Sequence, residues 1–204
     1  MIVKVCGMRE TDNIRAVEEA GADWMGFICY ERSPRHVECI PQYLPSLHRV
    51  GVFVNASYEY IHNRVQALHL DTVQLHGKES PSLCQRLQHD GLTVVKVFSL
   101  HSPHDLAQTQ PYRSCCNYFL FDTPCVEHGG SGRMFDWTLL KDYQEEIPFL
   151  LSGGINPDSI AALSNFHHPQ WAGIDLNSGF ETAPARKDAD KLRTFIQQFK
   201  SLKL

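Results

Sequence analysis

Eight short apolar segments recur along the chain, and their regular alternation with amphipathic segments constrains the fold more than any other feature. They are rich in β-branched and aromatic residues and occupy 2–6, 24–29, 50–54, 72–75, 93–98, 118–121, 149–151 and 171–176. Strands that alternate with helices at this spacing are typical of parallel βαβ units. Eight such units in 204 residues predict one α/β domain over 1–204, closed as a (β/α)8 TIM barrel.

Several of the connecting helices are marked by their first residues. Ser80-Pro81 and Asn156-Pro157 each combine a capping residue with proline at the first helical position, and Ser57 is expected to cap a third helix. Apolar stripes at helical spacing follow in two segments, and we expect them to face the core: Ile61, Val65 and Leu68, then Leu192, Phe195, Ile196 and Phe199. The segments 41–47 and 101–110 are polar or broken by proline, and each is predicted to be a weak helix or a loop with a single turn.

Composition narrows the class of protein. Hydrophobic residues make up 43% and charged residues 21%, which is ordinary globular composition. A net charge of −4 gives no general reason to expect nucleic-acid binding, and no apolar run approaches the ~20 residues of a membrane helix. The chain begins without an export signal, and its seven cysteines lack disulfide-framework spacing, so a cytoplasmic protein with reduced thiols is expected. No histidine or cysteine spacing indicates a metal site.

In a parallel barrel the active site lies at the carboxyl ends of the strands. Ser152-Gly153-Gly154 follows the seventh predicted strand, and Asn177-Ser178-Gly179 follows the eighth. Glycine lets backbone N–H groups approach an anion closely, and the loops after these two strands form the usual phosphate site of this fold. The simpler alternative is that the glycines only make tight turns. A phosphorylated small molecule is the expected ligand.

Three further side chains are candidates for chemistry. Cys6 ends the first strand on the same face as Lys4, and a deprotonated thiol there would serve as a base or nucleophile. Asp122 ends the sixth strand, where partial burial would suit a carboxyl group to proton transfer. Arg35 is suited to binding a carboxylate with two hydrogen bonds. Each has a plainer alternative. Cys6 would be a small buried hydrophobe, Asp122 a helix cap or a member of a surface ion pair, and Arg35 a solvated surface charge.

Taken together, these positions resemble the phosphoribosylanthranilate isomerase family of tryptophan biosynthesis. The resemblance runs nearly the whole length of the chain and rests on nine motifs in order: KVCGM at 4–8, GADWMGFI at 21–28, SPRHV at 33–37, VGVFVN at 50–55, QLHGKE at 74–79, FDT at 121–123, GGSGRMFDW at 129–137, LSGGINP at 151–157 and GIDLNSGFE at 173–181. One departure is Asn177, since the family's eighth loop more often reads Asp-Val-Ser-Ser-Gly.

The resemblance implies an Amadori rearrangement of N-(5′-phosphoribosyl)anthranilate to 1-(o-carboxyphenylamino)-1-deoxyribulose 5-phosphate, without metal or cofactor, by a monomer or homodimer. It assigns the general base to Cys6, the general acid to Asp122 and the anthranilate carboxylate to Arg35. It assigns the phosphate to the seventh and eighth loops, here Gly153, Gly154, Asn177 and Ser178.

Two rival functions remain open from the sequence. An indole-glycerol-phosphate synthase or a lysine Schiff-base aldolase would share the phosphate site, and Lys4 or Lys96 would supply an aldolase with its amine if either points inward. A non-catalytic barrel that binds a phosphorylated metabolite is the other alternative. A binder, however, has no need of a paired acid and base.

Overall fold

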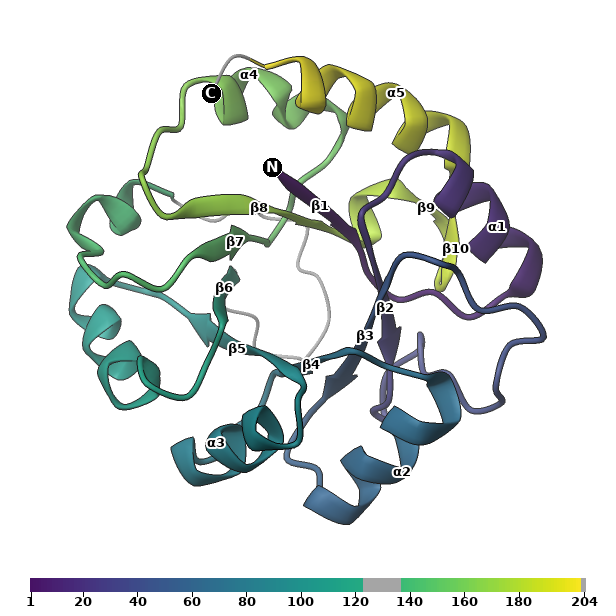
Figure 1. Cartoon of the computed structure of the whole chain (residues 1–204). Coiled ribbons are helices and arrows are strands. Elements are labelled where there is room, and N and C mark those ends of the chain that lie inside the picture. The colour runs from purple at the N-terminus through teal and green to yellow at the C-terminus, as the bar shows by residue number, and fades with distance from the viewer. Residues whose placement is uncertain (123–136, 203–204) are drawn as a thin grey trace.

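The computed structural model describes residues 1–122 and 137–202. Eight parallel strands close into a barrel in sequence order, as predicted (Figure 1). They are β1 (Ile2–Val5), β2 (Trp24–Ile28), β3 (His48–Phe53), β4 (Thr72–Leu75), β5 (Thr93–Ser99), β6 (Tyr118–Asp122), β7 (Phe149–Leu151) and β8 (Trp171–Leu176). The glycine-rich motif expected after the sixth strand, at 129–132, lies outside the described residues.

Helices surround the barrel (Figure 1). The α-helices are α1 (Thr11–Glu19), α2 (Tyr58–Leu68), α3 (Pro81–His89), α4 (Ile160–Ser164) and α5 (Ala189–Ser201). The 3₁₀ helices are η1 (Pro103–Tyr112), η2 (Trp137–Asp142), η3 (Pro157–Ser159) and η4 (Ser178–Phe180). A short antiparallel pair that the sequence pattern did not predict, β9 (Glu181–Ala183) and β10 (Arg186–Lys187), follows β8 and precedes the last helix.

The predicted caps explain where the helices begin. Ser57 accepts a hydrogen bond from the backbone N–H of Tyr60, and Ser80 accepts one from that of Leu83. Asn156 caps the 3₁₀ turn η3, and α4 begins only after that turn. The predicted apolar stripes of α2 and α5 are buried. The segment 41–47 contains no helix, and 101–110 falls largely within the 3₁₀ helix η1. The first segment is therefore a loop and the second a weak helix, the two outcomes predicted for these polar or proline-broken segments.

The barrel separates two layers of apolar side chains. Its interior is filled by Trp24, Val50, Val95, Val97, Leu120 and Leu150. A larger cluster lies between the outer faces of the strands and the helices. The barrel closes where β1 pairs with β8, with Ile2 opposite Gly173 and Val5 opposite Leu176. The interior is therefore a packed core below the mouth, crossed by the buried ion pair of Lys4 and Asp175.

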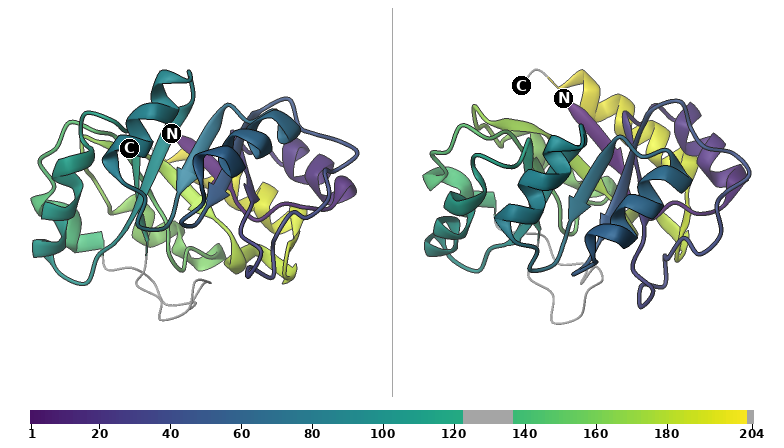
Figure 2. Two further views of the ribbon diagram at one scale, coloured as in Figure 1. Left: turned by 90° about the horizontal axis from the view of Figure 1, so that it is seen from below. Right: turned by 60° about the horizontal axis from the view of Figure 1, so that its bottom comes forward.

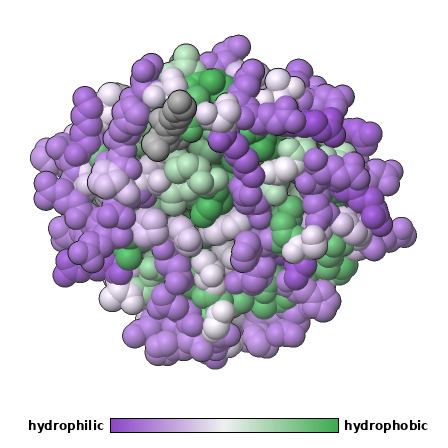
Figure 3. Space-filling view, turned by 45° about the horizontal axis from the view of Figure 1, so that its top comes forward, coloured by the Kyte–Doolittle hydropathy of each residue, from purple (hydrophilic) through white to green (hydrophobic). Residues whose placement is uncertain are grey.

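The start of β1 and the end of α5 lie at the same end of the barrel (Figure 2). The face in Figure 3 is covered mostly by hydrophilic residues, with small separate hydrophobic areas. Among the described residues the exposed large hydrophobic side chains are Met1 and Ile40. Within 1–122 and 137–202, no helix has the length and apolar character needed to cross a membrane.

The closure of the barrel gives a first prediction. A Cβ at Gly173 would lie 2.1 Å from the backbone oxygen of Ile2, so Gly173→Ala must push β8 away from β1. We expect this substitution to lower the free energy of unfolding by about 3 kcal/mol, measured by urea titration. Gly91→Ala is the matched control, because its φ is +84° and no atom lies within 4 Å of the added Cβ, leaving a backbone cost of about 1–2 kcal/mol. An equal loss of stability in the two variants would contradict this account of closure.

Candidate active site

A cavity of about 210 Å³ opens at the carboxyl ends of the strands, and each of β1 to β8, or the loop that follows it, contributes to its lining. All seven residues singled out from the sequence line this cavity: Cys6, Arg35, Asp122, Gly153, Gly154, Asn177 and Ser178. The parallel topology brings them together from both ends of the chain.

Cys6 follows β1 and is almost fully buried, with 4% of its surface exposed. Its backbone N–H donates to the carbonyl of Leu176 at 2.8 Å, and its sulfur would lie only 2.8 Å from a Cβ at Gly26. Burial raises the pKa of the Cys6 thiol, and the positive charges of Lys4 and Lys187 oppose that rise. The thiol is thus both a small buried group and a member of the cavity wall, and nearby cations favour its ionised form.

Neither strand lysine presents a free amine to the cavity. Lys4 points into the barrel, fully buried, and its Nζ donates to both carboxylate oxygens of Asp175 at 2.9 Å. Lys96 lies on the outer face of β5, where its Nζ donates to three backbone carbonyls and pairs with Glu79 at 3.3 Å. Since no lysine is among the described residues that line the cavity, the Schiff-base aldolase loses its nucleophile.

Asp122 ends β6 at the cavity mouth, and 23% of its side chain is exposed. Its Oδ2 lies 3.6 Å from Nε2 of His76, which follows β4 and also lines the cavity. His76 belongs to the QLHGKE motif, but the sequence assigned it no role. The pair offers a carboxyl group whose orientation a neighbouring imidazole can fix.

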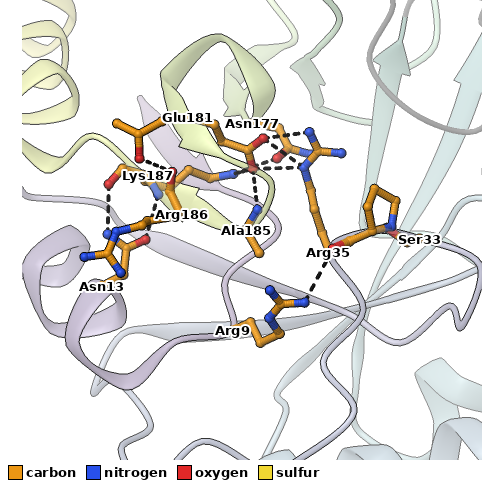
Figure 4. Close-up of polar contacts among 11 residues, drawn as sticks. Arg9, Asn13, Ser33, Arg35, Asn177, Glu181, Ala185, Arg186 and Lys187 are labelled. Atoms are coloured by element: carbon orange, nitrogen blue, oxygen red, sulfur yellow. Dashed lines mark hydrogen bonds and ion pairs between the residues drawn. The ribbon is translucent and has the colours of Figure 1, made fainter.

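Arg35, on the loop after β2, is held in an ion pair that the sequence did not predict. Its Nε donates to Glu181 Oε1 at 2.9 Å, and its Nη2 donates to Oε2 at 2.6 Å. Glu181 in turn accepts from Lys187 Nζ at 2.5 Å, and Lys187 also donates to Asn177 Oδ1 at 2.7 Å (Figure 4). Burial alone would raise the pKa of Glu181, but hydrogen bonds from Arg35 and Lys187 hold it below its ordinary value. Glu181 was visible in the GIDLNSGFE motif, whereas no motif contained Lys187.

The loops after β7 and β8 lie against each other, since a Cβ at Gly179 would be 2.3 Å from the carbonyl oxygen of Ile155. Gly153 and Gly154 both have left-handed backbone conformations, with φ of +83° and +71°. Glycine adopts these angles without strain and leaves the backbone N–H groups uncovered. The two loops therefore form one small-residue wall of the cavity, suited to a phosphate.

The structure also brings together three cysteines that sequence spacing did not connect. The sulfur atoms of Cys84, Cys115 and Cys116 lie within 4.8 Å of one another, and all three residues are buried. Within the described part of the chain, these three side chains are close enough together to hold a metal ion. None of the three lines the cavity, so the cluster is separate from the candidate active site.

Comparison with known proteins identifies the family. A family model described as N-(5′-phosphoribosyl)anthranilate (PRA) isomerase matches residues 3–198. The N-(5′-phosphoribosyl)anthranilate isomerase of Phocaeicola vulgatus is 55% identical over 201 residues, which cover 98% of each chain. The crystal structure of phosphoribosyl anthranilate isomerase from Thermotoga maritima is similar with a TM-score of 0.85 and 33% identity, over 99% of this chain and 100% of that one.

A second crystal structure shows such an isomerase in complex with reduced 1-(o-carboxyphenylamino)-1-deoxyribulose 5-phosphate. It is similar with a TM-score of 0.81 and 31% identity, over 99% of this chain and 100% of that one. The sequence motifs, the closed barrel and these relatives agree. The chain belongs to the N-(5′-phosphoribosyl)anthranilate isomerase family.

Proposed function

We propose that Cys6 is the general base and Asp122 the general acid of the isomerisation that this enzyme catalyses in tryptophan biosynthesis. The reaction converts N-(5′-phosphoribosyl)anthranilate, an aldose derivative, into 1-(o-carboxyphenylamino)-1-deoxyribulose 5-phosphate. The observation that carries the proposal is that one cavity is lined by both side chains, together with an arginine and two glycine-containing loops. Such a set matches the needs of an anionic substrate that must gain one proton and lose another.

The first step opens the sugar ring. Protonated Asp122 donates its proton to the ring oxygen of the furanose, the bond from that oxygen to C1′ breaks, and the nitrogen lone pair forms a protonated Schiff base. Asp122 is left as a carboxylate. The imidazole of His76, 3.6 Å from its Oδ2, is placed to steady the carboxyl group through this change.

The second step moves the double bond. The Schiff-base cation acidifies the hydrogen on C2′, the Cys6 thiolate removes it, and the electron pair passes to nitrogen to give an enolamine. Tautomerisation of the enolamine then yields the amino-ketose. Burial raises the pKa of the Cys6 thiol, and Lys4 and Lys187 partly offset that rise, so these two cations assist formation of the thiolate that acts as the base. One acid and one base suffice for both transfers, so the proposed mechanism uses neither metal nor cofactor.

The two ends of the substrate fix its position in the cavity. We assign the anthranilate carboxylate to Arg35, which can offer two parallel N–H donors. The phosphate is assigned to Gly153, Gly154, Asn177 and Ser178. The Oδ1 atom of Asn177 already accepts from Lys187, so in this proposal its backbone or Nδ2 group, rather than Oδ1, serves the phosphate.

The remaining assignments are part of the same proposal. A single catalytic domain over 1–204 acts in the cytoplasm as a monomer or homodimer, on a small phosphorylated molecule and without nucleic-acid partners. The non-catalytic barrel is the alternative to be tested, and measurable turnover of the substrate excludes it.

The acid and base assignments predict large losses of turnover. Cys6→Ser and Asp122→Asn should each lower kcat about 10²–10⁴-fold with little change in KM, because each removes a proton-transfer group without removing a substrate contact. The decay of substrate fluorescence, with substrate made in situ, measures both. Cys39→Ser is the control, since Cys39 is exposed. Wild-type turnover by the Cys6→Ser variant would refute the choice of base.

The carboxylate assignment predicts a change mainly in KM. Arg35→Lys keeps the charge but loses the planar pair of donors, so KM should rise about 10-fold or more while kcat changes less. Steady-state kinetics on the same assay separate the two constants. Arg32→Lys, an exposed position three residues earlier, should leave both unchanged. If Arg35→Lys raises KM no more than Arg32→Lys does, the carboxylate binds elsewhere.

A further inference from the structure

We propose that Glu181 and Lys187, on the β9–β10 pair, are positioning residues of this active site. Glu181 holds the guanidinium of Arg35 with one edge directed at the substrate carboxylate, and Lys187 ties that ion pair to the phosphate loop and to the backbone beside Cys6. The inference rests on the proposed role of Arg35 and goes beyond it, because neither Glu181 nor Lys187 is assigned a substrate contact.

The geometry of the Arg35–Glu181 pair leaves half of the guanidinium available. Glu181 occupies the Nε–Nη2 edge, with distances of 2.6 to 3.1 Å. Figure 4 shows the third nitrogen, Nη1, on the side turned away from Glu181, and Nη1 donates no hydrogen bond to residues 1–122 or 137–202. A carboxylate can therefore approach along the Nη1–Nη2 edge while Glu181 stays bound. Both side chains are nearly buried, with 11% and 7% exposed, so the arginine has little freedom to turn.

Lys187 is a buried cation held at both ends. Its side chain is 0% exposed, and its Nζ bonds both Glu181 and Asn177. Its backbone is fixed by Asn13 of α1, which accepts from the Lys187 N–H at 2.7 Å and donates to its carbonyl at 2.8 Å. A lysine buried only for packing is disfavoured because its charge must leave water. Here the Lys187 ammonium group links Glu181, which holds Arg35, to Asn177 in the loop after β8.

The same cluster packs against the backbone next to the proposed base. Gly7 has φ of +79°, and a Cβ there would lie 2.8 Å from Arg35 Cδ, 3.0 Å from Asn177 Oδ1 and 3.4 Å from Lys187 Nζ. The position following Cys6 therefore has no room for a side chain, because Arg35, Asn177 and Lys187 all lie close to it. The ion-pair cluster and the segment that carries the thiol are therefore close neighbours.

Charge supports the same role. With both cations protonated and Glu181 ionised, the cluster of Arg35, Lys187 and Glu181 carries one net positive charge beside a site that must hold a carboxylate and a thiolate. The charged groups that act on Cys6 are Lys4 and Asp175 from inside the barrel, Lys187 from β10 and Arg35 from the loop after β2. Lys4 lowers the pKa of Cys6 most strongly, but its partner Asp175 opposes that effect, and Lys187 is the second cation that lowers this pKa.

A binding experiment tests the role of Glu181. The probes are the reduced product analogue, which carries the anthranilate carboxylate, and the same compound with aniline in place of anthranilate. Glu181→Gln should weaken binding of the carboxylated probe about tenfold or more and leave the Kd of the other probe unchanged. Glu10→Gln, which breaks the exposed pair with Arg186 nearby, should alter neither Kd. Equal Kd values for wild type and Glu181→Gln with the carboxylated probe would overturn the proposal.

Binding is measured in a Cys6→Ser background as well, so that the outcome does not depend on the identity of the base. Arg35→Lys separates the two proposals. If Arg35→Lys binds the carboxylated probe as tightly as wild type does, the carboxylate assignment has failed. Weaker binding of that probe by Arg35→Lys but not by Glu181→Gln overturns only the positioning role.

A pH profile tests Lys187. Removing its positive charge raises the pKa of Cys6, so the limb of kcat/KM that rises as the thiol ionises should move about one unit to higher pH in Lys187→Met. Lys187→Arg should return the limb toward the wild-type position. The double variant Glu181→Gln/Lys187→Met removes both buried charges and guards against misfolding of the single variant. An unmoved limb in folded Lys187→Met and in the double variant would contradict a positioning role for this lysine.

Discussion

The pairing of β1 with β8 holds together the parts of the chain on which the active site depends. Val5 lies opposite Leu176, and the next residue, Cys6, donates its backbone N–H to the same leucine. Lys4 and Asp175, 171 positions apart, form their ion pair across this junction. Because a barrel has no free edge only when its first and last strands pair, the requirement that stabilises the fold also brings the proposed base beside the phosphate loop and the residues that follow it.

Buried charge shapes the site that closure creates. Moving lysine and carboxylate groups out of water is costly, and each such group here recovers interaction energy from a close partner. The ion pairs differ in the net charge that remains after pairing. Lys4 and Asp175 neutralise each other at the cavity floor, which Asp175 lines, whereas the cluster around Glu181 has two cations for one carboxylate. The interior is thus electrically balanced, and the excess positive charge lies at the rim, where an anionic substrate enters.

The extent to which the sequence predicted this arrangement follows from the range of the interactions involved. Short apolar runs predicted all eight strands within two residues, because a buried parallel strand leaves a local signal. Parallel topology then placed the strand-end residues at one mouth. The outward direction of Lys96 was not predictable, since β5 is apolar on both faces and alternation alone does not say which is inside. The Arg35–Glu181 pair spans 146 positions. Glu181 and Lys187 lie on strands of three and two residues, too short to show a period.

Glu181 and Lys187, to which the sequence assigned no role, share one physical function: they hold Arg35 in place. Cys6 and Asp122 adjoin or end barrel strands, whose hydrogen-bonded neighbours fix the backbone on both sides. Arg35 lies on a loop, where a long side chain loses more conformational freedom on binding a substrate. A bidentate carboxylate, itself anchored by a buried lysine, supplies to that side chain the rigidity that a strand supplies to the others. Substrate binding at the rim can therefore be adjusted through the β9–β10 pair while the barrel that positions the acid and the base stays unchanged.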